Sequence, residues 1–144
     1  MFDDNLTFID GTVDYNAAND TAPSSLTRDA ATGAAVLDIG ETGKNGLVAV
    51  LIVPNDVNGA TDTLTAKLEA CDAVGFGSAV QELGKFGVAN ATTGIILGSE
   101  VPCVAMLKFA TNLRYVRING TVGATPDDFG AVKAYLVSDA YKVL

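Results

Sequence analysis

The stretch Arg114-Tyr115-Val116-Arg117-Ile118-Asn119-Gly120-Thr121-Val122 decides the fold. Its residues alternate with the period of two that is typical of a β-strand. One face is apolar and holds Val116, Ile118 and Val122. The other face is polar and holds Tyr115, Arg117, Asn119 and Thr121. The sequence therefore predicts a strand that buries one face and offers the other for hydrogen bonding; the odd spacing of Arg114 and Arg117 sends these two arginines to opposite faces.

A turn-rich segment, 123–130, follows this strand, and a second alternating run occupies 131–137. We expect these two strands to form a hairpin that closes one end of an all-β domain. Working outward, further strands are predicted at Leu6–Ile9, Ala35–Gly40, Leu47–Pro54, Thr63–Asp72, Ile95–Leu97 and Val104–Phe109. Roughly eight short strands joined by glycine-rich turns are typical of a single β-sandwich, jelly-roll-like in its spacing.

Thr63–Asp72 alternates most cleanly, with Leu64, Ala66, Leu68 and Ala70 inward. Leu47–Pro54 is apolar at nearly every position, which predicts a strand covered on both faces. In 74–93, Ser78 and Gln81 could cap a helix. Four glycines weaken that helix by about 1 kcal/mol each, so a strand or a single turn in a long loop is favoured.

We expect the 144 residues to form one domain, residues 1–144, that begins with an irregular arm over about residues 1–33. The formal net charge of −8 disfavours nucleic acid and acidic membrane surfaces as partners. Met1–Asp4 is acidic where an export signal would be basic. We therefore expect synthesis in the cytoplasm, and Cys71 and Cys103 to stay reduced.

The sequence contains no histidine, which removes the common nucleophile–histidine systems and the usual zinc ligands. We expect no catalytic residues, no metal, no cofactor and no enzymatic activity. The loop Asp56–Asp62 has oxygen ligands at spacings that loosely suggest a cation, but it lacks the pattern of an EF-hand, so a plain turn is the simpler interpretation. Asp127 and Asp128 are also interpreted as turn residues.

The remaining candidate site comprises Tyr115, Arg117, Asn119 and Thr121, on the polar face of the strand Arg114–Val122, together with Arg114 at its start. It could be an ordinary face in contact with solvent. The alternative is a subunit interface, because arginine and tyrosine combine contact area with directional hydrogen bonds. On that hypothesis Arg117→Ala weakens assembly and leaves the fold intact.

These segments resemble the capsid cement (decoration) proteins of tailed phages, of the small jelly-roll type. The resemblance is carried by Val36–Gly40, by Thr63–Asp72 and most strongly by Leu113–Gly123 with the strand that follows. It covers most of residues 35–138, and 74–98 match least. It implies a non-enzymatic trimer on the outer surface of the virion capsid, bound to the major capsid protein. The alternative is a receptor- or glycan-binding β-sandwich domain of a virion fibre or tail.

Overall fold

A computed structural model describes residues 4–16, 21–40, 44–54, 63–89, 103–123 and 129–138. A short 3-10 turn, η1 (Asp4–Leu6), precedes the first strand. The described strands are β1 (Thr7–Asp10), β2 (Leu37–Asp38), β3 (Lys44–Val53), β4 (Thr63–Cys71), β5 (Gln81–Ala89), β6 (Cys103–Thr111), β7 (Tyr115–Gly123) and β8 (Lys133–Ser138).

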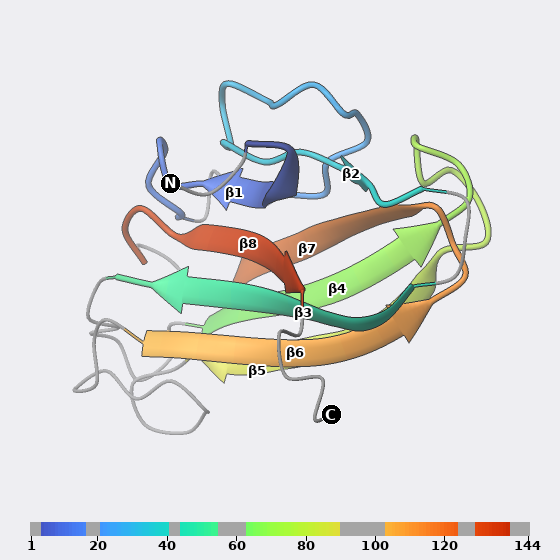
Figure 1. Cartoon of the computed structure of the whole chain (residues 1–144). Coiled ribbons are helices and arrows are strands. Elements are labelled where there is room, and N and C mark those ends of the chain that lie inside the picture. The colour runs from blue at the N-terminus through green and yellow to red at the C-terminus, as the bar shows by residue number, and fades with distance from the viewer. Residues whose placement is uncertain are drawn as a thin grey trace.

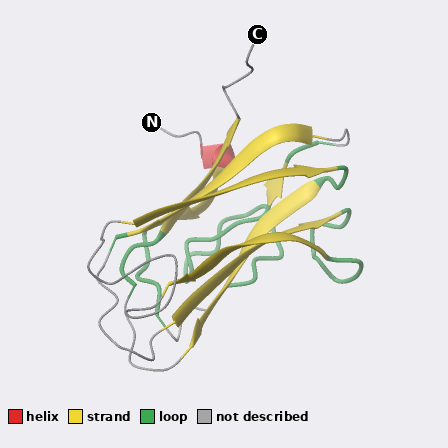
Figure 2. Ribbon diagram, turned by 90° about the horizontal axis from the view of Figure 1, so that it is seen from below, coloured by secondary structure: helices red, strands yellow, loops and turns green. Residues whose placement is uncertain are grey.

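The strands form two antiparallel sheets of four, in the orders β1-β8-β3-β6 and β2-β7-β4-β5. Figure 1 looks onto the first sheet, which we call the front sheet; the second, the back sheet, lies behind it. Seen from below, the strands lie in two layers (Figure 2). The predicted all-β sandwich is confirmed.

The core lies between the sheets and is built from the alternating residues of both. In β4, Leu64, Ala66, Leu68 and Ala70 are all buried, as the sequence predicts. From β7, Val116 and Ile118 enter the same core, and Ala49, Leu51 and Val53 enter it from β3. The alternation in the three strands therefore fixes which face of each points inward.

The predicted hairpin between the two C-terminal runs is wrong. β7 lies in the back sheet between β2 and β4, whereas β8 lies in the front sheet between β1 and β3. Each strand takes its hydrogen-bond partners from elsewhere in the chain, so the connection crosses from one sheet to the other. Alternation shows that both segments are strands, but it carries no information about which strands pair.

Segment 74–93 contains a strand and not the capped helix, because residues 81–89 form β5 and pair with β4. The short strand predicted at Ile95–Leu97 lies outside the described residues.

The N-terminal arm is held against the sandwich by backbone hydrogen bonds. Thr21 and Gly120 of β7 each donate to the carbonyl of the other, at 3.0 and 2.9 Å. Tyr15 N donates to Gly130 O at 2.8 Å, and Phe129 N donates to Tyr15 O at 2.9 Å. The described part of the arm thus runs along the edge of β7 in the back sheet, and its Tyr15 enters the core.

Candidate interaction surfaces

Arg117, at the centre of the predicted polar face, is buried inside the protein's own structure. β7 and β4 pair with Arg117 directly opposite Glu69, and both residues are 9% exposed. The Arg117 Nε donates to Glu69 Oε2 at 2.8 Å, and Nη2 lies 2.8 Å from the same oxygen. Nη1 donates to the carbonyl of Pro23 in the arm at 3.0 Å. The guanidinium also lies 4.1 Å from the ring centroid of Phe76.

The neighbouring polar residues extend this arrangement. Asn119 donates through Nδ2 to Glu69 Oε1 at 3.2 Å, so both oxygens of that carboxylate are engaged. Thr121 is exposed, whereas Tyr115 and Asn119 are only partly exposed. Most of the predicted polar face is therefore used within the molecule.

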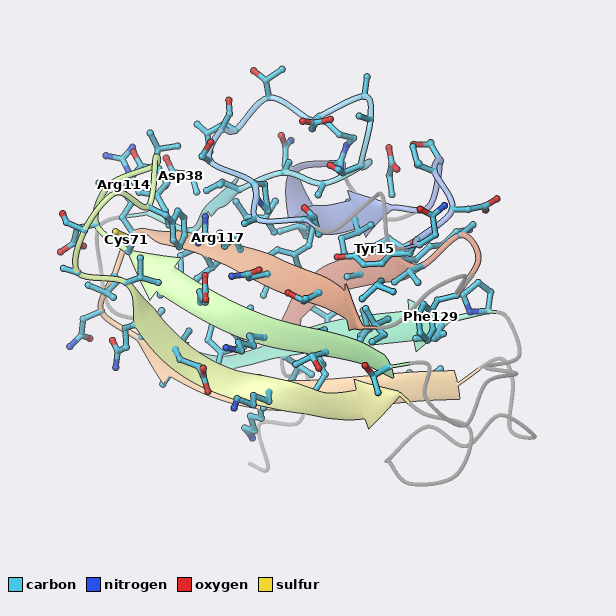
Figure 3. The ribbon with its side chains drawn as sticks, turned by 180° about the vertical axis from the view of Figure 1, so that it is seen from behind. Tyr15, Asp38, Cys71, Arg114, Arg117 and Phe129 are labelled. Carbon is cyan, nitrogen blue, oxygen red and sulfur yellow. The ribbon has the colours of Figure 1, made fainter. Side chains whose placement is uncertain are left out.

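Arg114 lies just before β7 and makes a second ion pair nearer the surface. Its Nε donates to both carboxylate oxygens of Asp38 at 3.1 Å, and Nη2 donates to Oδ2 at 2.8 Å. The Arg114 guanidinium lies 5.1 Å from the ring centroid of Tyr115. Hydrogen bonds from Arg114 and from the Gly40 amide, together with the positive charge of Arg114, hold the pKa of Asp38 below its usual range. Figure 3 shows Arg114 and Asp38 together at one end of the sandwich.

The expectation that Arg117 lies open on a polar strand face is therefore corrected. Pro23 of the arm and Phe76 of the β4–β5 loop cover the guanidinium, and neither contact is visible in the alternation of β7. One clue lies in the sequence, because Glu69 occupies an outward position in β4. The charge of Glu69 complements Arg117, but only the strand pairing brings the two together.

A different surface is both exposed and apolar: the outer side of the front sheet. The front face, as we call it, comprises Val48, Val50 and Ile52 of β3, Val104, Met106 and Lys108 of β6, and Lys133, Tyr135 and Val137 of β8. Register places Val50 between Met106 and Tyr135, and Ile52 between Val104 and Lys133. Met106 is 72% exposed and Val104 is 54% exposed. The apolar residues therefore form one continuous patch across three adjacent strands.

This patch corrects the prediction that β3 is covered on both faces. Ala49, Leu51 and Val53 are buried in the core, but Val48, Val50 and Ile52 alternate with them and are only partly buried. The signal in the sequence was the lack of polar residues in Leu47–Val53. That signal shows that both faces of the strand are apolar; it cannot say whether the outer cover belongs to this chain.

The outer side of the back sheet has the opposite character. Lys67 of β4 and Lys85 of β5 both approach the carboxylate of Glu82, at 3.6 and 3.9 Å. These side chains are well exposed, which suits an ordinary solvated surface. The two outer faces of one sandwich therefore differ, one charged and hydrated, the other apolar.

The β4–β5 loop, residues 72–80, forms a second exposed apolar feature. Val74 and Val80 are 36% and 40% exposed. Phe76 and Ala79 have φ values of 50° and 53°, which are uncommon for residues other than glycine. Phe76 is buried beneath Arg117, and the Cys71 thiol donates to Ser78 O at 3.1 Å. These anchors hold the loop in one shape with its valines on the outside.

Among the described residues there is no group of three or more acidic, cysteine or histidine side chains that could hold a metal ion. The loops Asp56–Asp62 and Asp127–Asp128 lie outside the described residues. Cys71 is a free, buried thiol. In the part of the chain that the structure describes, no helix has the length and apolar character needed to span a membrane.

The geometry defines the class of the protein as an all-β sandwich with one apolar outer face. Comparison with models of known protein families gave no match, and comparison with curated proteins gave none either.

Proposed function

We propose that this protein is a structural, non-enzymatic component of a virion: a capsid cement (decoration) protein. It binds the major capsid protein on the outside of an icosahedral head as a homo-oligomer, a trimer, and stabilises contacts between capsomers. The observation that carries this proposal is the front face. A chain with a net charge of −8 leaves an apolar patch over three strands, centred on Val50 and Met106, without cover among its described residues.

The physical argument concerns what such a patch does in water. Apolar surface left in water costs about 25 cal/mol of free energy for each Å², relative to burial. Large continuous apolar patches on monomers usually mark interaction sites. The centres of stable protein interfaces are apolar and depleted in charge. The front face has this composition, with Lys108 and Lys133 at its margins and no carboxylate among the residues that define it.

The strand order adds support. Two sheets in the orders β1-β8-β3-β6 and β2-β7-β4-β5 agree with an eight-stranded jelly roll, the type implied by the resemblance. The segments that carry the resemblance, Thr63–Asp72 and Leu113–Gly123, contain β4 and β7. These two strands pair along their whole length and contribute much of the core.

The test is co-sedimentation with heads assembled from the virus that encodes this chain, with the chain itself deleted. We expect the purified protein to sediment with the heads and to raise the temperature at which they open. Met106→Glu places a charge in the apolar patch. It should break up the oligomer and thereby abolish binding to heads, whereas Lys67→Glu on the back sheet should leave both the oligomer and the binding unchanged. Failure of the unaltered protein to bind such heads contradicts the proposal.

A second candidate is a receptor- or glycan-binding domain of a fibre or tail, and one observation favours it. A hollow of about 480 Å³ lies over the arm, lined by polar side chains that include Ser24, Ser25, Thr27, Thr32, Arg28 and Asp29. Hydroxyl and charged groups of this kind bind sugars by hydrogen bonding. A glycan array separates the candidates: binding that is lost in Asp29→Ala supports this second function.

A further inference from the structure

We infer that the front face of one copy receives the β4–β5 loop (residues 72–80) of the next copy, in a head-to-tail contact. This inference rests on the proposed function, which calls for an oligomer, and it names the two surfaces that form the contact. The occupant of the apolar patch is therefore a second copy of this chain, and the part that enters is the loop with Val74 and Val80.

The loop presents apolar side chains on a backbone that its own contacts hold in place, as a segment that enters a partner's surface should. Val74 and Val80 are exposed, although apolar residues of this size are usually buried. The buried ring of Phe76 fixes the base of the loop, and its amide donates to Ala73 O at 3.0 Å. The left-handed conformations of Phe76 and Ala79 cost free energy, and they persist only where the surrounding structure holds them. A rigid loop loses little conformational entropy on binding, which favours its use as a contact.

The charges of the two surfaces are complementary. The front face carries Lys108 and Lys133 at its margins, and both are exposed. The loop begins at Asp72, an exposed carboxylate beside the valines. Head-to-tail contact brings Asp72 towards a lysine and the valines onto the apolar centre. In a face-to-face contact between two front faces, the lysines would meet no carboxylate, because none of the residues that define the face is acidic.

The positions of the two surfaces determine the kind of assembly. The loop follows β4 of the back sheet, at the end of the sandwich where Figure 3 shows Cys71, whereas the front face is the outer side of the opposite sheet. The two surfaces are different patches, so the contact is heterologous. Heterologous contacts generate a ring when the rotation between copies closes. In a closed ring of three copies, every front face receives a loop and every loop enters a front face.

Disulfide trapping tests the contact directly. In a Cys103→Ser background, with Cys71 buried, Val80→Cys and Met106→Cys are made separately and together. We expect crosslinks after mild oxidation when the two single variants are mixed, and in the double variant, which should give a covalent trimer. Each single variant alone should stay uncrosslinked. Crosslinking of Met106→Cys with itself shows face-to-face copies and overturns the inference.

A charge swap provides an independent measurement by light scattering. Lys108→Glu and Asp72→Lys should each weaken association by about tenfold, and the double swap should recover much of the loss. Lys67→Glu is the matched control and should leave association unchanged. A last outcome concerns a monomeric Met106→Cys variant. If its thiol becomes reactive only after residues 139–144 are removed, the chain's own C-terminal segment covers the patch. This result also overturns the inference.

The outcomes separate this inference from the proposed function. Binding to heads without the Val80–Met106 crosslink means that the function stands and the contact is wrong. The crosslink without binding to heads means that the contact stands and the function is wrong.

Discussion

Arg117 and Glu69 face each other across β7 and β4, with guanidinium nitrogens 2.8 Å from a carboxylate oxygen and each residue only 9% exposed. Asn119 engages the other oxygen of the carboxylate, and the Pro23 carbonyl accepts a further hydrogen bond from the guanidinium. A buried ion pair of this kind is costly to break from one side, because the remaining charge stays desolvated.

Arg117→Ala is therefore expected to destabilise the fold by about 3 kcal/mol, since it leaves the Glu69 carboxylate buried with Asn119 alone. Arg114→Ala, which removes the more exposed pair with Asp38, should cost less than about 1 kcal/mol. Urea denaturation followed by circular dichroism measures both. If both variants lose equally little stability, the Arg117 pair does not hold the arm and the loop together as described.

A pH dependence follows from the lowered pKa of Asp38. The unfolded carboxyl titrates near pH 3.9, so the folded state favours the ionised form at lower pH than the unfolded state does. The stabilisation is complete above that value and is lost as the pH falls through the folded pKa. Asp38→Asn should flatten the acid limb of stability against pH. Arg114→Gln should raise the Asp38 pKa, measured by NMR titration; an unchanged pKa would show that Arg114 is not the cause.

Gly120→Ala should destabilise the protein and detach the arm from β7. A Cβ at this position would collide with the hydroxyl of Tyr15 and lie 2.9 Å from its Cζ, and Tyr15 is itself buried. Gly75→Ala is the matched control, because a Cβ there meets nothing within 4 Å. Hydrogen exchange of the Thr21 amide reports arm detachment, and equal exchange in both variants would contradict the packing of Tyr15 on Gly120.

The Cys71 thiol should resist modification in the native protein. It is 1% exposed, donates to Ser78 O and accepts from the Ala73 amide at 3.4 Å. In a Cys103→Ser variant, a thiol reagent should react with Cys71 only as fast as the fold opens, and at once in denaturant. Rapid reaction under native conditions would indicate that the β4–β5 loop opens freely.

Alternation was sufficient to predict most of the sandwich. In β4 and β7 every second residue is apolar, and these residues enter the core as expected. Strand pairing was not predictable, because hydrogen bonds between backbones are largely indifferent to side-chain identity. The predicted hairpin between β7 and β8 was wrong for this reason.

The candidate site shows the same limit. The polar residues of β7 were identified correctly as hydrogen-bonding residues, but their partners, Glu69 and Pro23, come from distant parts of the chain. The front face was missed because an apolar strand such as Leu47–Val53 predicts a cover without saying what provides it. Only the structure shows that the outer neighbours, Met106 among them, remain exposed.

The pairing of β1 with β8 has a kinetic consequence. Thr7 lies opposite Tyr135, so the front sheet is incomplete until strands from the two far parts of the described chain meet. Closure over such sequence separations is slow, in the range of milliseconds to seconds for β-sandwiches. During that interval the edge of β3 that later pairs with β8 is open, and open edges pair readily with other chains. The concentration of newly made chains should therefore decide how many of them reach the native sandwich before they associate.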